Sequence, residues 1–246
     1  MSYAFTYWEG TPYAFTKVCI NSITNIFGSK HIHLTLDSID NYIPLDLSVK
    51  ECKHLPYRSD YIRTMLLERY GGWWFDCDVL LFKDPRCIIS KDKPQIWNLI
   101  YRVQGNWVPL INNGILYSPS YSRWITSIAE DFRKINANGL VLLYENEDIG
   151  QNIYEKHSVG NPDVVVGCEY DFNSRFNVDA DYKPFWDGTI KLDSANCGIH
   201  IGASLSRWAA ADGDLQASDI LSITSLDTLI SQFPKSVVNQ YLKSFS

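Results

Sequence analysis

The sequence predicts an α/β fold built as a single domain. Strand-like segments, in which apolar and polar residues alternate, are followed along the chain by helix-like segments, in which apolar residues recur at helical spacing. This order is typical of α/β domains. The length of 246 residues fits one large domain, and no repeat, low-complexity run or linker divides the chain. Hydrophobic residues make up 46% of the chain and charged residues 20%, which is ordinary for a globular protein.

The first elements are predicted from alternation and from capping residues. Residues 3–8 are expected to form a strand. In the helix that follows, Thr11 is the expected cap, Pro12 takes the first helical position and Gly28 ends the helix. Residues 31–36 alternate between polar and apolar side chains, which predicts a second strand.

An irregular stretch precedes the next helix, which is expected to begin at Ser59 or Asp60 and to end at Gly71. Residues 73–82 are too β-rich and too apolar for a surface loop, so one continuous strand is expected there, closed by Pro85.

The rest of the chain continues the alternation and ends in two short helices separated at Pro234. The further elements expected are strands over 95–101, 114–117, 164–167 and 196–201, and helices over 119–135 and 148–157.

Composition and charge exclude several classes of protein. No run reaches the roughly 18 apolar residues of a membrane span, and the net charge of −6 argues against a nucleic-acid-binding surface. The start of the chain shows no signal-peptide pattern, so a cytoplasmic protein with at most peripheral membrane contact is expected. The six scattered cysteines are expected to be reduced core residues. Aromatic residues, at 14%, are abundant enough to stack on ring-shaped ligands as well as to fill the core.

The most informative segment for chemistry ends in an Asp-x-Asp motif. On one continuous strand Trp74, Asp76 and Asp78 would share a face, because side chains alternate across a strand. Two carboxylates side by side after an apolar strand are costly unless a cation lies between them. Oxygen ligands suit Mg²⁺ or Mn²⁺, which also bind the oxygens of a diphosphate.

The motif alone is weak evidence, because Asp-x-Asp occurs three times in this chain. The other two pairs, at 179–181 and 212–214, lie in polar, turn-rich stretches and are expected to be solvated. The pair Asp76 and Asp78 is preceded by a capped helix, a Gly-Gly turn and an apolar strand. This context distinguishes it from the other two.

The same segment resembles a known family of enzymes. Ser59-Asp-x-x-Arg63, then Tyr70-Gly-Gly, then Trp74 two residues before Asp76-x-Asp78, is similar to the DxD-containing sugar-binding region of glycosyltransferases. That family includes yeast initiating α-mannosyltransferases, α-1,4-galactosyltransferases and capsular polysaccharide transferases and, more distantly, the clostridial glucosylating toxins. The close match covers about residues 58–85.

The resemblance implies a GT-A glycosyltransferase fold, with a Rossmann-like mixed sheet flanked by helices, in a single catalytic domain over 1–246. It implies a donor-binding half over about 1–100, an acceptor-side half over about 101–215 and C-terminal helices over about 216–246. Weaker similarities extend it along the chain: Trp8 lies in a Trp-x-Gly element, Asn113 in an Asn-Asn-Gly element, and Ser206 and Trp208 in a closing segment.

The resemblance also implies roles for donor-binding residues. Trp8 would stack on the base, Asp60 would bind ribose or base, and Trp74 would pack on the donor. Arg63 would contact the donor sugar near the first carboxylate, and Asp76 would bind ribose or sugar hydroxyls, partly through metal-bound water.

Further roles concern the metal, the diphosphate and the acceptor. Asp78 would ligate the metal directly. In the toxins a Glu three residues before the closing Ser also holds the metal, and this chain has Ala203 at that position. His200 is expected to replace that Glu as a nitrogen ligand, which would favour Mn²⁺ over Mg²⁺. The remaining expected contacts are those of Ser206 and Trp208 with metal and β-phosphate, Asn113 with sugar and acceptor, and Asp148 with donor or acceptor.

Together with the resemblance, these residues predict a metal-dependent glycosyltransferase that moves a sugar from a nucleotide sugar to a glycan or other hydroxyl, and the resemblance implies that it is retaining. A UDP-sugar is favoured as donor, with a GDP-sugar second. Two alternatives remain open at this point. One is a metal-dependent phosphohydrolase with Asp76 as nucleophile and Asp78 as acid. The other is a non-enzymatic carbohydrate-binding module, supported by aromatic richness alone.

Overall fold

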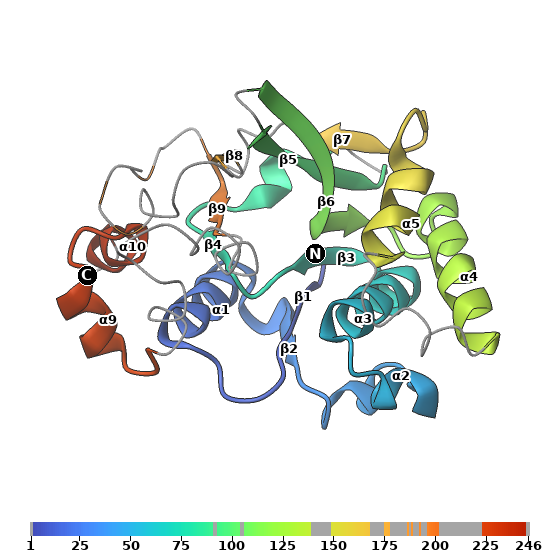
Figure 1. Ribbon diagram of the computed structural model, residues 1–246, viewed down its shortest axis with the longest axis horizontal. Helices are drawn as coiled ribbons and strands as arrows, with labels where there is room; N and C mark the ends of the chain where they lie inside the picture. Colours follow the sequence, from blue (N-terminus) through green and yellow to red (C-terminus); the bar gives the residue numbers. More distant parts are fainter. Residues whose placement is uncertain are drawn as a thin grey trace.

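The computed structural model describes residues 2–90, 93–103, 106–138, 149–167, 175–177, 186, 188, 192, 196–201 and 223–244. These form a mixed seven-stranded sheet with helices on both sides, and a separate two-stranded sheet. In the main sheet the strand order is β2-β1-β3-β6-β5-β7, with β8 paired to β5 (Figure 1). The predicted α/β class, with a Rossmann-like mixed sheet flanked by helices, is confirmed.

The N-terminal part is a parallel unit of strands and helices. Strand β1 (Ala4–Tyr7) pairs in parallel with β2 (His31–Leu34) and β3 (Gly72–Phe75), and helix α1 (Ala14–Phe27) connects the first two. The expected cap at Thr11 is wrong, because Tyr13 is the extended residue before α1. The N–H of Ala14 instead donates to the carbonyl of Ile223, 2.9 Å away, so a tertiary contact sets this end of the helix.

Helix α3 begins earlier than the sequence indicates. A short α2 (Leu47–Glu51) lies in the stretch expected to be irregular, and α3 (Leu55–Tyr70) contains both Ser59 and Asp60. Pro56 lies in the first turn of α3, where its missing N–H breaks no helical hydrogen bond. Asp60 is therefore a buried residue inside the helix and not its cap.

The strand expected over 73–82 is broken at the Asp-x-Asp motif. The ladder of β3 ends where the N–H of Asp76 donates to the carbonyl of Gly114 at 2.8 Å, and Val79 then closes a turn on the carbonyl of Asp76. The chain resumes as β4 (Val79–Leu81), which pairs antiparallel with β9 (Gly198–His200) in the small sheet. Asp76 and Asp78 thus lie in a turn between two sheets and not on one face of a strand.

Strands β5 (Gln95–Val103) and β6 (Asn106–Ser118) form a long antiparallel pair, and β6 also pairs antiparallel with β3. The sequence predicted only 114–117 of β6, because Pro109 and the two asparagines interrupt its strand pattern. The pairing register shifts between Ile96, which pairs with Leu116, and Trp97, which pairs with Asn112, so residues 113–115 of β6 have no partner position in β5. Such irregularities bend a strand and redirect side chains, here beside Asp76.

Strands β7 (Val165–Gly167) and β8 (Arg175–Asn177) pair in parallel with β5, and β8 was not predicted.

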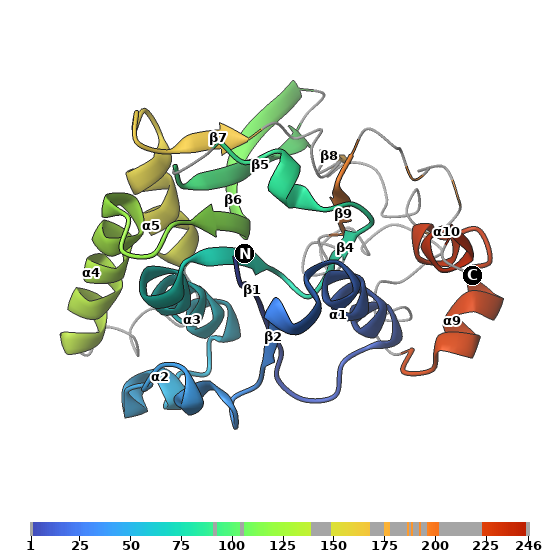
Figure 2. The same cartoon turned by 180° about the vertical axis from the view of Figure 1, so that it is seen from behind.

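The helices lie in two groups, seen in both views. Helices α4 (Arg123–Ala137) and α5 (Ile149–Ser158) pack with α3 (Figures 1 and 2). On the other side, α1 lies with the two short C-terminal helices that were predicted around Pro234, α9 (Leu226–Gln232) and α10 (Val237–Ser244). Helix α4 begins after its cap Ser122 and not at 119. Short 3-10 helices occupy Gly28–Lys30, Ile39–Asn41 and Pro85–Cys87.

Strand β3 separates two layers of core. Trp73 and Phe75 point to the layer that contains α1, where Trp73 stacks on Phe75 and on Trp97 with ring centroids 5.4 Å apart in both pairs. Trp74 points to the opposite layer, which is built mainly from α3, α4 and α5. Within the described part of the chain four of the five cysteines are buried, while Cys87 is exposed and does not belong to the core as expected. No helix among these residues is both long and apolar enough to span a bilayer.

Candidate active site

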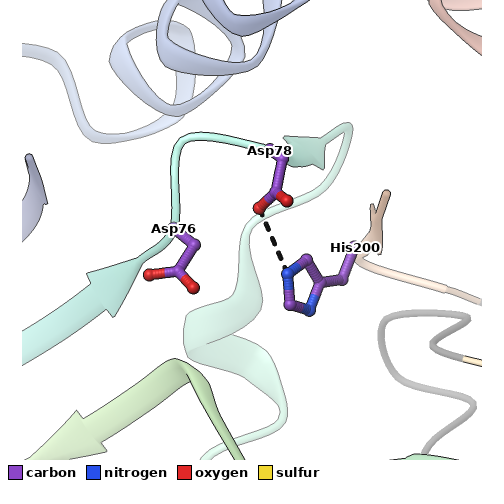
Figure 3. Close-up of side chains that lie close together, drawn as sticks. All are labelled: Asp76, Asp78 and His200. Atoms are coloured by element: carbon purple, nitrogen blue, oxygen red, sulfur yellow. Dashed lines mark ion pairs between the residues drawn. The ribbon is translucent and has the colours of Figure 1, made fainter. Parts of the chain in front are cut away.

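Asp76, Asp78 and His200 come together at the end of β3. Figure 3 shows the two carboxylates on the turn and the imidazole entering from β9. One ligand atom from each residue can be chosen so that all three lie within 4.8 Å of one another. Because Mg²⁺ holds oxygen ligands at about 2.1 Å, its ligand atoms lie within roughly 4.2 Å of each other. Small side-chain movements would therefore let the three residues hold one divalent cation.

His200 is tied to Asp78 in this cluster. Its Nε2 lies 3.1 Å from Oδ1 of Asp78, and its Nδ1 lies 3.4 Å from the side-chain amide of Asn112. Burial of the imidazole opposes protonation, but the Asp78 carboxylate outweighs it and raises the pKa of His200. Two carboxylates and an imidazole, with Asp76 30% and Asp78 14% exposed, form a donor set suited to Mn²⁺.

Arg63 is the buried cation of the site. Its Nη2 lies 3.1 Å from Oδ1 of Asp60 and 3.1 Å from Oδ1 of Asp76, and its side chain is 4% exposed. Its Nη1 donates to the main-chain carbonyl of Asn113. Burial alone would lower the pKa of Arg63, but Asp76 and Asp60 raise it, so the guanidinium remains charged.

Trp74 connects Arg63 to the first carboxylate of the motif. Its indole Nε1 donates to Oδ1 of Asp76 at 2.8 Å, and the guanidinium of Arg63 lies 5.0 Å from the centre of its ring. Trp74 is 1% exposed. In this structure the ring is therefore a support that orients Asp76 and Arg63, and its predicted packing against a donor stays a prediction.

The irregular segment of β6 brings its polar residues to the same place. The side-chain amide of Asn113 donates to Oδ1 of Asp60 at 2.9 Å. A Cβ at Gly114 would lie 2.7 Å from Oδ2 of Asp76 and 2.8 Å from Cε1 of His200. Gly114 therefore leaves the space in which these two side chains approach each other.

Trp8 follows the end of β1 and is half-buried. Its ring meets Tyr13 edge to face, with centroids 5.5 Å apart. The indole Nε1 is buried and has no hydrogen-bond partner among the described residues. The next residue, Glu9, pairs with Arg58 of α3 through both carboxylate oxygens, at 2.8 and 2.7 Å.

The ion pair between Glu9 and Arg58 was not predicted from the sequence. The position of Arg58, five residues before Arg63, could have marked it as a candidate, but its partner lies 49 residues away along the chain. Asp148, Ser206 and Trp208 lie outside the described residues, so their expected contacts stay predictions. The same holds for the Asp-x-Asp pairs at 179–181 and 212–214.

Comparison with known families bears on the segment that contains this site. A family model described as capsular polysaccharide synthesis protein matches residues 9–97, less than half of the chain. The match includes Asp60, Arg63 and the Asp-x-Asp pair, on which the predicted resemblance depends. The expected resemblance to capsular polysaccharide transferases is thereby confirmed over this segment. A comparison with curated proteins finds no match.

Solved structures of glycosyltransferases are similar to the chain. One, involved in glycosylation of the major capsid of PBCV-1, is 15% identical with a TM-score of 0.44, over 71% of this chain and 86% of that chain. The PaToxG glycosyltransferase is 13% identical with a TM-score of 0.38, over 65% and 70%. Apo GlyE of Streptococcus pneumoniae TIGR4 is 10% identical with a TM-score of 0.47, over 97% and 64%.

Proposed function

We propose that the protein is a metal-dependent, retaining glycosyltransferase that uses a nucleotide sugar, with a UDP-sugar favoured over a GDP-sugar. The sugar would pass to a hydroxyl of a glycan or another acceptor. The observation that carries the proposal is the cluster of Asp76, Asp78 and His200 at the end of β3, with ligand atoms within 4.8 Å of one another. Arg63 and Trp74 support this cluster from one side.

Asp78 and His200 would hold Mn²⁺, or Mg²⁺, together with Asp76. When bound, such an ion neutralises charge on the departing nucleoside diphosphate. Asp76 is the most exposed of the three, at 30%, so it is also placed to accept a hydrogen bond from a ribose or sugar hydroxyl. Arg63 adds a fixed positive charge next to Asp76, where an incoming donor would meet it.

Trp8 is the proposed platform for the base, and its buried Nε1 supports this because it lacks a partner among the described residues. Asn113 would face the sugar and acceptor. Asp148 is a proposed donor or acceptor contact, and Ser206 and Trp208 are proposed contacts of metal and β-phosphate. Retention would need no enzymic nucleophile if the leaving phosphate helped to deprotonate the acceptor. A cytoplasmic location and the absence of nucleic-acid partners stay predictions.

Substitution of Asp78 by Asn tests the proposal. Asn keeps the shape of the side chain but removes the charge that a cation needs, so Mn²⁺-stimulated sugar transfer or donor hydrolysis should fall at least 100-fold with a panel of UDP- and GDP-sugars. Asp37→Asn is the control, since it removes one charge at an exposed position. Full metal-stimulated turnover by Asp78→Asn would refute the assignment.

A further inference from the structure

We infer that Gly150, which has no side chain, leaves the space that Asp60 occupies (the seat of Asp60), and that Asp60 is a positioning residue and internal counter-ion for Arg63. Gly150 belongs to α5 and Asp60 to α3, so this contact joins two helices behind the candidate active site. The seat itself depends on packing alone. Its consequence for cation binding rests on the proposed function.

The carboxylate of Asp60 is directed at protein groups. Oδ1 lies 3.1 Å from Nη2 of Arg63 and accepts a hydrogen bond from the side chain of Asn113 at 2.9 Å. The side chain of Asp60 is 7% exposed. Arg63 in turn donates to the carbonyl of Asn113, so the three residues form a closed triangle. A carboxylate in this position fixes two residues of the site, Arg63 and Asn113.

Gly150 is the second residue of α5, and its backbone packs directly on Asp60. A Cβ at position 150 would collide with Oδ2 and Cγ of Asp60 and would lie 2.7 Å from its Cβ. Rotation of the carboxylate cannot relieve a collision with Cβ. Any side chain at 150 must therefore move Asp60 as a whole and separate it from Arg63 or Asn113.

Other contacts prevent α5 from moving away. The side-chain amide of Gln151 donates to the carbonyl of Ile111 in β6. The hydroxyls of Tyr154 and Thr64 lie 2.7 Å apart, and both residues are fully buried. With α5 held in place, Asp60 must give way when position 150 acquires a side chain.

The charges of the site explain why Asp60 is needed. Nη2 of Arg63 lies 3.1 Å from a carboxylate oxygen of Asp60 and 3.1 Å from one of Asp76. With Asp60 present, one negative charge offsets Arg63, and the charges of Asp76 and Asp78 remain available for a divalent cation. Without it, Arg63 would interact with Asp76 alone and would compete with the cation for that carboxylate.

A double-mutant cycle on unfolding tests the seat. Gly150→Ala should raise the unfolding equilibrium constant about 100-fold, because it separates a buried ion pair. In an Asp60→Gly background the same change should have at most about a tenfold effect, because both the carboxylate and the Cβ with which it collides are gone. Asn152→Ala, at an exposed position of α5, is the control and should change stability little. Equal effects of Gly150→Ala in both backgrounds would overturn the seat.

Titration of Mn²⁺ by calorimetry tests the counter-ion role without requiring turnover. Asp60→Asn should weaken Mn²⁺ binding about tenfold, and Asp60→Asn/Arg63→Gln should restore most of the loss. Asp163→Asn, at an exposed position, is the control for the loss of one negative charge. Unchanged affinity in Asp60→Asn would overturn the role. A wild type that binds no Mn²⁺ would refute the proposed function and the counter-ion role together, while the unfolding cycle would still decide the seat.

Discussion

Substitution of Arg58 by Met should destabilise the protein by about 3 kcal/mol, because breaking a buried ion pair typically costs about 3–5 kcal/mol. Arg58 is 7% exposed and Glu9 21% exposed. The guanidinium of Arg58 also donates hydrogen bonds to the main-chain carbonyls of Val49, at 3.2 Å, and of Cys52. The lower end of the range applies because Tyr7 still donates to Glu9, at 2.6 Å.

Urea unfolding followed by circular dichroism measures this loss directly. For a domain of this length, about 3 kcal/mol corresponds to a fall in Tm of roughly 6–12 °C. Arg58→Lys keeps the charge but loses the planar fork, so it should recover only part of the stability. The same Arg58→Met variant should bind a nucleotide more weakly, because Glu9 directly follows Trp8. If the free energy of unfolding fell by less than about 1 kcal/mol, the ion pair of Arg58 and Glu9 would not hold the residues after β1, including Trp8, against α3.

Two further predictions concern pH and the space around Asp76. Burial, and then the proximity of His33, lower the pKa of His31 to about 4, so stability should decline as pH falls from about 6.5 towards 4, by up to roughly 3 kcal/mol. Between pH 7.5 and pH 5 the free energy of unfolding should fall less in His31→Gln than in the wild type. Equal falls in both proteins would contradict the lowered pKa of His31 as their cause. Gly114→Ala should weaken Mn²⁺ binding about tenfold while costing under about 1 kcal/mol, because its Cβ meets the ends of the Asp76 and His200 side chains. Unchanged Mn²⁺ affinity in calorimetry would contradict this placement.

Local patterns in the sequence were sufficient for much of the fold, and the family resemblance indicated the residues that meet at the centre of the site. Alternation placed Trp74 on one face of a strand, and the core layers show that it points away from the side of Trp73 and Phe75. The resemblance placed Arg63 near Asp76, and in the structure Nη2 of Arg63 lies 3.1 Å from Oδ1 of Asp76. Neighbours along the chain could therefore be placed from the sequence.

Features that depend on distant partners could not be predicted in this way. The break after Phe75 exists because β4 leaves the main sheet to pair with β9, about 120 residues later in the chain. The full length of β6 depends on pairing with β5, which outweighs the unfavourable Pro109. Propensity alone gives no information about such partners. The seat of Asp60 on Gly150 likewise joins positions that no local pattern connects.

Binding of UDP, GDP, CDP and ADP, each with and without Mn²⁺, tests the central claim most directly. A ligand at 100 times its dissociation constant adds about 2.7 kcal/mol to stability, which a thermal melt detects easily. The account predicts a rise in Tm with UDP that requires Mn²⁺ and is lost in Asp78→Asn. No rise with any of the four nucleotides, or an equal rise without metal, would contradict a metal-dependent nucleotide-sugar site at Asp76, Asp78 and His200.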